Sequence, residues 1–225
     1  MVVLAGLFFL VAVFAPIKQR SLECIGPQKL SDRILLLDAG HGGEDGGAVS
    51  VTGKPESGIN LAIVLRLDAL CGFFGVNTIL TRQDDTSLKD KNSKTLAQMK
   101  RTDLNNRVKL VNSQQNAVLI SIHQNFFFGS NNTGSQVFFA PTAGSELLAL
   151  HCQQILVQKL DPSNHRQAKK ISSDIYLMNH VTCPAILVEC GFLSNQAEAH
   201  KLEEAGYQTK LAAAILTAYL TFPPS

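Results

Sequence analysis

Three short, largely apolar runs along the chain each lead to a side chain that can bind a metal or move a proton. They span residues 34–37, 117–122 and 185–188. Runs of this kind are typical of strands buried on both faces of a sheet. The first leads into a glycine-rich segment that contains His41, and the others end at His123 and Glu189. Because ligands bind at the carboxyl edge of a parallel sheet, we expect these three side chains to lie close together.

The segments between these runs alternate between helical and extended patterns. Helices are expected over residues 56–67, 103–112, 145–160 and 207–220, and further strands over 76–81, 135–140 and 174–179. The polar, lysine-rich stretch 87–99 is expected to be an exposed loop or a frayed helix. Such alternation predicts a single α/β domain, with a twisted, mostly parallel (mixed) sheet of about six strands flanked by helices on both faces.

The amino-terminal residues 1–16 carry no charge and are almost wholly apolar, and Lys18 and Arg20 follow them. This run is short for a membrane-spanning helix, and it fits a signal-peptide core or an uncleaved anchor. We therefore expect an exported protein, either secreted or held at the membrane by this segment. The predicted organisation is a hydrophobic segment at 1–17, a linker at 18–31 and a catalytic domain at 32–222.

The composition indicates a single-domain protein and gives no sign of a nucleic-acid-binding or disulfide-rich one. A chain of 225 residues with 45% hydrophobic content can bury one full core. A net charge of +2 gives no reason to expect a nucleic-acid partner. The five cysteines are odd in number, widely spaced and without a C-x-x-C pair, which argues against a disulfide framework or a thiolate zinc site.

His41, Glu56 and His123 are of the residue types that zinc hydrolases use as their three protein ligands, with a fourth position left for water. They predict one zinc ion per chain. Glu56 also fits a structural role, because it follows a proline and falls in the first turn of a predicted helix. Glu189 is the candidate proton shuttle, since its apolar neighbours would raise the pKa of a carboxylate. Its alternative is a carboxylate that caps a turn.

Four further residues are candidates for supporting roles around this centre. Asp38 either accepts a hydrogen bond from the second ring nitrogen of a ligand histidine or forms a turn at the strand end. Arg82 and Arg107 either orient a carboxylate of the substrate or pair internally. Asn125, two residues after His123, is a further candidate for orienting the substrate.

Four motifs in this order resemble a known family. They are Leu-Asp-Ala-Gly-His-Gly-Gly at 37–43, Glu56 at the start of a helix, Ser-Ile-His-Gln-Asn at 121–125 and Leu-Val-Glu-Cys-Gly-Phe-Leu-Ser-Asn at 187–195. Over about residues 33–222 the chain resembles the zinc-dependent N-acetylmuramoyl-L-alanine amidases of the amidase_3 type. The resemblance implies a twisted mixed sheet and hydrolysis of the amide between N-acetylmuramic acid and L-alanine in peptidoglycan. It also implies that His41, Glu56 and His123 bind zinc and that Glu189 is catalytic.

A narrower likeness involves Asp-Leu-Asn-Asn-Arg at 103–107, Gly-Ser-Gln-Val-Phe-Phe at 134–139 and Tyr-Gln-Thr-Lys at 207–210. These segments look like those of spore-cortex amidases, which remove stem peptides so that a deacetylase can form muramic δ-lactam. This likeness implies a role in sporulation and germination, a place in the cortex-facing space of the developing spore, and a candidate activator protein. The alternatives are a general wall-turnover or cell-separation amidase and a catalytically silent muropeptide-binding protein.

Overall fold

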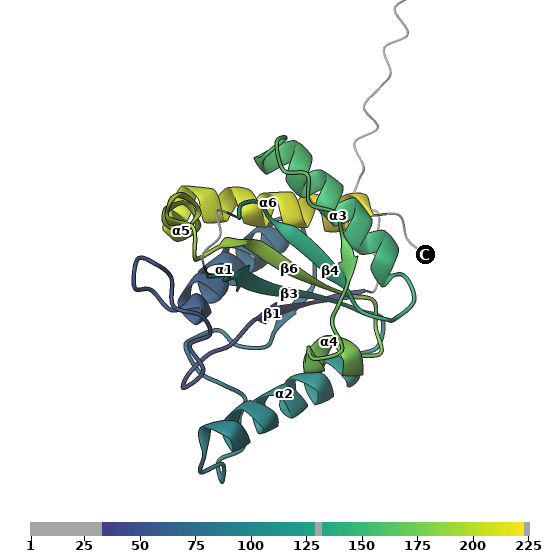
Figure 1. Cartoon of the computed structure of the whole chain (residues 1–225). Helices are drawn as coiled ribbons and strands as arrows, with labels where there is room; N and C mark the ends of the chain where they lie inside the picture. Colours follow the sequence, from purple (N-terminus) through teal and green to yellow (C-terminus); the bar gives the residue numbers. More distant parts are fainter. Residues whose placement is uncertain (1–32, 129–131, 223–225) are drawn as a thin grey trace, which may run out of the picture.

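The three apolar runs of the sequence form the middle of the sheet. The computed structural model describes residues 33–128 and 132–222. In it, β1 (Ile34–Ala39), β3 (Ala117–Asn125) and β6 (Ala185–Phe192) lie side by side and parallel (Figure 1). Most of their residues are buried, which agrees with the largely apolar pattern expected of strands covered on both faces.

Three shorter strands complete a six-stranded sheet in the order β2-β1-β3-β6-β4-β5. They are β2 (Thr78–Leu80), β4 (Gln136–Phe139) and β5 (Lys169–Lys170). Strand β4 runs antiparallel to β6, whereas β1 is parallel to both of its neighbours. The predicted mixed sheet of about six strands is therefore confirmed.

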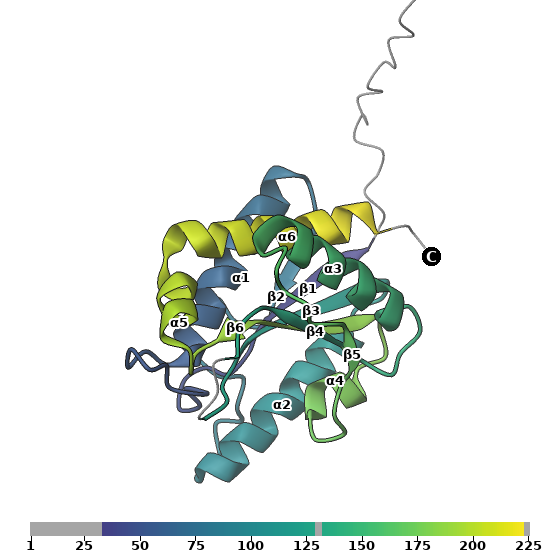
Figure 2. The ribbon, with the colours of Figure 1, turned by 45° about the horizontal axis from the view of Figure 1, so that its top comes forward.

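Helices cover both faces of the sheet, as the alternating pattern predicted (Figure 2). On one face lie α1 (Glu56–Phe73), α3 (Ser145–Leu160) and α6 (Ala205–Thr221), with α5 (Gln196–Glu203) beside α6. On the other lie α2 (Leu96–Asn112) and α4 (Tyr176–His180). Strand alternation divides the apolar side chains between two cores: Leu35 and Leu37 face α1, whereas Leu36 packs with residues of α2 and α4.

The prediction of a strand over residues 174–179 is wrong. Residues 176–180 form the short helix α4. The strand that pairs with β4 at that edge of the sheet is β5. Leu177 and Met178 are adjacent in sequence, yet both are buried in the core beneath α2. A strand would point them to opposite faces, whereas a helical turn buries both.

One helix begins earlier than expected, and one further helix was not expected. Helix α2 begins at Leu96 rather than near 103, because Thr95 and Gln98 form a capping box at its start. Helix α5, which the apolar pattern did not indicate, begins after Asn195, whose side chain accepts hydrogen bonds from two backbone N–H groups.

The chain leaves β1 and β3 in opposite directions along the sheet. After β1 it passes through α1 to β2, and after β3 it leads to β4 beyond β6. Such a divergence opens a crevice at the carboxyl ends of the two strands, which is where α/β sheets bind ligands. His41 and His123 both lie there.

Within residues 33–128 and 132–222, no helix has the length and apolar character needed to cross a membrane. The hydrophobic segment expected at 1–17 and the linker at 18–31 lie outside the described residues.

Candidate metal centre

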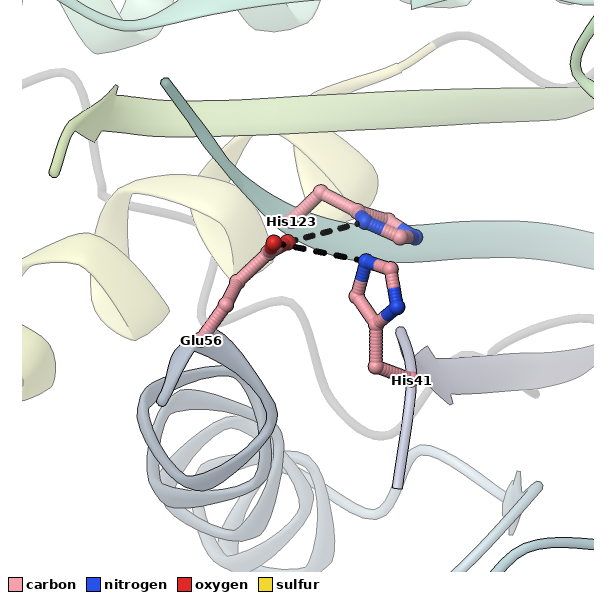
Figure 3. Close-up of side chains that lie close together, drawn as sticks. All are labelled: His41, Glu56 and His123. Carbon is pink, nitrogen blue, oxygen red and sulfur yellow. Dashed lines mark hydrogen bonds and ion pairs between the residues drawn. The ribbon is translucent and has the colours of Figure 1, made fainter. Parts of the chain in front are cut away.

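His41, Glu56 and His123 point toward one another from three different elements (Figure 3). His41 follows β1, Glu56 is the first residue of α1, and His123 lies near the end of β3. One ligand atom from each lies within 4.8 Å of the other two. The structure therefore brings together the three residues that the sequence suggested as metal ligands, although 67 positions separate Glu56 from His123.

The separations between donor atoms suit a small tetrahedral ion. Nε2 of His41 lies 3.3 Å from Oε2 of Glu56, and Nδ1 of His123 lies 3.1 Å from Oε1. Ligands at about 2.0–2.1 Å from a tetrahedral zinc ion lie roughly 3.3 Å apart. Two imidazoles and one carboxylate are also a common zinc donor set. The residues present therefore fit a zinc ion.

Glycines allow the three side chains to approach so closely. A Cβ atom on Gly40 would lie 2.2 Å from the His123 ring, and one on Gly47 would lie 2.6 Å from Oε2 of Glu56. His41 itself has a φ of 62°, which is uncommon for a residue with a side chain. The glycine-rich loop after β1 thus makes the space in which the ligands meet.

Backbone and amide donors hold the Glu56 carboxylate in place. Its Oε2 accepts a hydrogen bond from the N–H of Ala48 (3.1 Å). Its Oε1 accepts hydrogen bonds from the N–H of Gln124 (3.0 Å) and from Nδ2 of Asn60 (3.1 Å). Asn60 also donates to the carbonyl of Gly40 (3.2 Å), so it ties Glu56 to the His41 loop.

The charges in the centre favour an ionised carboxylate and a protonated histidine. Burial alone would lower the pKa of His41, but its hydrogen bonds to Asp45 and Glu56 outweigh burial and raise the pKa to about 9. Burial likewise opposes ionisation of Glu56, yet His123 and His41 hold the pKa of Glu56 well below its usual range. A metal ion that binds here must therefore displace a proton from His41.

Glu189 lies beside His123, because the two residues pair across β3 and β6. Its Oε2 is buried and has no hydrogen-bond partner among the described residues. Burial is the main cause that raises the pKa of Glu189 to about 7. A carboxylate with this pKa, next to the three converging side chains, can accept and release a proton near neutral pH.

Asp38 accepts its hydrogen bonds from groups other than the histidines of the centre. Its Oδ2 accepts a hydrogen bond from Ser121 (2.5 Å), and its Oδ1 accepts hydrogen bonds from Thr81 (2.8 Å) and Arg107 (2.5 Å). Burial opposes its ionisation, but the charge of Arg107 and the hydrogen bonds from Ser121 and Arg107 lower the pKa of Asp38 to about 2. Of the two alternatives for Asp38, the described residues do not show the hydrogen bond from a histidine of the centre.

Besides Glu56, the carboxylate that contacts a histidine of this centre is Asp45, which the sequence did not point to. Its Oδ2 lies 3.0 Å from Nδ1 of His41. The spacing of four residues between His41 and Asp45, inside one glycine-rich loop, was the available signal. It was weak, because the conformation of such a loop does not follow from its sequence pattern.

Both buried arginines are engaged inside the protein. Arg82 donates to the carbonyls of Ala39 (2.9 Å) and Gly40 (3.1 Å), and Arg107 donates to that of His41 (2.7 Å). Arg107 also pairs with Asp103 at 2.8 Å. Together the two guanidinium groups hold the backbone that leads into the His41 loop.

Asn125 is half-buried at the end of β3, where its carbonyl accepts a hydrogen bond from the N–H of Leu193 (2.8 Å). That contact joins β3 to the segment after β6. A role of its side chain in orienting a substrate stays a prediction.

A cavity of about 190 Å³ opens beside the two histidines. Polar residues including Asp45 and Lys100 line one part, and apolar residues of α2 and α4 such as Leu104 and Met178 line another. The centre is therefore accessible to a substrate from this side of the sheet.

An α/β sheet with two histidines and a glutamate at its carboxyl edge, an adjoining cavity and a nearby protonatable carboxylate is typical of metal-dependent hydrolases. The comparison with known families is more specific. The model of the Amidase_3 family, N-acetylmuramoyl-L-alanine amidase, matches residues 35–220, and the chain belongs to this family.

Several relatives agree with this assignment. The chain is 39% identical to the germination-specific N-acetylmuramoyl-L-alanine amidase of Bacillus subtilis, over 86% of this chain and 81% of that protein. It is 30% identical to the amidase LytC of the same organism, over 80% of this chain but only 34% of LytC. The structure also resembles that of the CwlD amidase from Clostridioides difficile in complex with the GerS lipoprotein. That match has a TM-score of 0.80 and 38% identity, and it covers 84% of this chain and 97% of the other.

Proposed function

We propose that this protein is a zinc-dependent N-acetylmuramoyl-L-alanine amidase in which His41, Glu56 and His123 hold one zinc ion per chain. The convergence of these three side chains carries the proposal, because their donor atoms lie within 4.8 Å of one another. Zinc in such a site supplies a water of lowered pKa and polarises an amide carbonyl.

Glu189 is the proton shuttle in this proposal. The reaction adds the water oxygen to the carbonyl carbon of the lactyl group and breaks the bond from that carbon to the nitrogen of L-alanine. Glu189 accepts the proton of the attacking water and delivers it to the leaving nitrogen. Its buried Oε2, which no described residue hydrogen-bonds, supports this role.

The substrate that we propose is cortex peptidoglycan in the developing spore, where removal of stem peptides would lead to muramic δ-lactam. Support comes from the relative named germination-specific amidase, at 39% identity, and from the CwlD structure at 38% identity. We further propose that the protein acts outside the cytoplasm. The segment at 1–17 would direct its export or attach it to the membrane, and residues 32–222 would be the catalytic domain.

A lipoprotein partner is part of this proposal. The similar CwlD amidase was solved in complex with the GerS lipoprotein. A partner of this kind would place the enzyme at a membrane surface and could act as its activator.

General wall turnover is the second candidate function. Support for it comes from 29% identity to a protein of Bacillus anthracis named an uncharacterized cell wall amidase, over 86% of this chain but only 36% of that protein. The two candidates differ in substrate and not in chemistry, so they are separated by the peptidoglycan on which the enzyme acts.

The test is mass spectrometry of muropeptides after the protein is incubated with peptidoglycan from spores and from vegetative cells. Zinc-dependent release of intact stem peptides, lost in Glu189→Gln and kept in Glu146→Gln, is the expected result. Glu146 is an exposed carboxylate of α3 and serves as the matched control. No release from either material by a zinc-loaded protein would refute autonomous amidase activity, and equal release from both would favour general wall turnover.

A further inference from the structure

The carboxylate of Asp45 joins the metal centre to helix α2. Its Oδ2 lies 3.0 Å from Nδ1 of His41, and its Oδ1 pairs with Nζ of Lys100 on α2 at 2.8 Å. The backbone N–H of Gly47 also donates to Oδ1, at 3.4 Å. Asp45 is therefore held by a helix and by its own loop while it faces His41.

The loop that carries Asp45 is closed by its own backbone. The N–H of Gly42 donates to the carbonyl of Asp45 (2.8 Å), and the N–H of Asp45 donates to the carbonyl of Gly42 (3.2 Å). The His41 side chain keeps 25% of its surface exposed, so packing covers only part of the ring. A specific polar contact is then needed to select the ring orientation.

We propose that Asp45, oriented by Lys100, is a positioning residue that presents Nε2 of His41 to the metal ion. The inference rests on the zinc-dependent function proposed above. A neutral imidazole carries a single N–H. When His41 donates the Nδ1–H to Asp45, the lone pair of Nε2 is left facing Glu56, whose Oε2 lies 3.3 Å away. Histidines that bind metals usually donate their other ring N–H to such an acceptor.

The neighbouring Glu44 offers a matched control in the same loop. Its carboxylate pairs with Lys89, so it also ties the loop to the segment that precedes α2. Its other side-chain contact is a hydrogen bond from Ser87 at 3.5 Å, and it contacts no histidine within the described part of the chain. Removal of Glu44 therefore takes away a loop ion pair without touching His41.

The experiment measures zinc dissociation constants by chelator competition for the wild-type protein and for Asp45→Ala, Asp45→Asn, Lys100→Met and Glu44→Ala. We expect zinc binding to weaken about 10- to 100-fold in Asp45→Ala. Asp45→Asn keeps an acceptor oxygen and should lose less, and Lys100→Met should lie between wild type and Asp45→Ala. Glu44→Ala should bind zinc as the wild type does.

Two further readouts separate positioning from general stability. The unfolding temperature of each metal-free variant reports the loss of an ion pair, and the visible spectrum of the Co²⁺-substituted protein reports the ligand geometry. We expect the Co²⁺ spectrum to change in Asp45→Ala and to stay as in the wild type in Glu44→Ala. Wild-type zinc affinity in Asp45→Ala, or an equal loss in Glu44→Ala, would overturn the positioning role. Failure of the wild-type protein to bind zinc would instead refute the proposed function and this inference with it.

Discussion

Three glycine-to-alanine substitutions can separate backbone strain from direct displacement of the proposed metal ligands. Gly53 has a φ of +90° and no neighbouring atom within 4 Å of the place that a Cβ would take, so alanine there meets strain alone. Gly40 has no left-handed φ, but its Cβ would lie 2.2 Å from the His123 ring. Gly47 combines a φ of +71° with a Cβ that would lie 2.6 Å from Oε2 of Glu56.

The magnitudes follow from these contacts. A left-handed backbone costs an alanine roughly 1–2 kcal/mol, so Gly53→Ala should lose about that much unfolding free energy and keep its zinc affinity. Ordinary contact begins at 3.4 Å, so alanine at Gly40 must displace the His123 side chain and alanine at Gly47 must displace that of Glu56. We expect zinc binding to weaken at least about tenfold in both, which corresponds to about 1.4 kcal/mol.

The assay pairs chelator competition for zinc with urea unfolding of the metal-free proteins. Gly47→Ala should lose both stability and zinc affinity, whereas Gly53→Ala should lose stability alone. Wild-type zinc affinity in Gly40→Ala, or the same loss of affinity in Gly47→Ala and Gly53→Ala, would refute the argument that these glycines make room for the ligands.

The remaining predictions concern the charged groups. Because the metal-free protein holds a proton on His41 with a pKa of about 9, zinc affinity should rise about tenfold per pH unit from pH 7 toward 9; chelator competition that gives a flat profile there would contradict this. Asp38→Asn leaves Arg107 with Asp103 as its one charged partner among the described residues, and it should cost about 3 kcal/mol of unfolding free energy. A urea titration that shows a loss below about 1 kcal/mol would contradict this. The folded-state pKa of Asp38, about 2, lies below its ordinary value of 3.8, so its contribution to stability should be present above pH 4 and fade as the pH falls toward 2; unfolding measured across this range, with Asp38→Asn as the reference, checks the sign.

Much of the fold was readable from the sequence because burial imposes a simple pattern. The three central strands are largely apolar, and helix α3 spans the predicted residues Ser145–Leu160. The failures occurred where local chemistry outweighs the apolar pattern. The capping box of Thr95 and Gln98 extends α2, and the short segment around Leu177 reads equally well as a strand or as a helical turn.

The main residues of the candidate site could also be predicted from the sequence. Places after strands pointed to His41, His123 and Glu189, because parallel strands bring their carboxyl ends to one edge. Glu56 was suggested by its residue type, at the start of a predicted helix. The supporting residues were not readable in the same way. Which acceptor a histidine ring meets depends on loop geometry within a few tenths of an ångström, and periodicity carries no such information.

The sequence by itself determined the kind of sheet, the edge at which the chemistry lies and the donor types that meet there, since these follow from which residues must be buried. Only the tertiary structure decided which charged side chains pair with one another. The Asp38 carboxylate, on β1, accepts hydrogen bonds from Ser121 and Arg107. The loop closed by Gly42 and Asp45 instead places the Asp45 carboxylate next to His41. Asp38 and Asp45, which flank His41 in the sequence, thus have different partners. The reason is that the course of the backbone decides which hydrogen-bond donors lie within reach of a carboxylate.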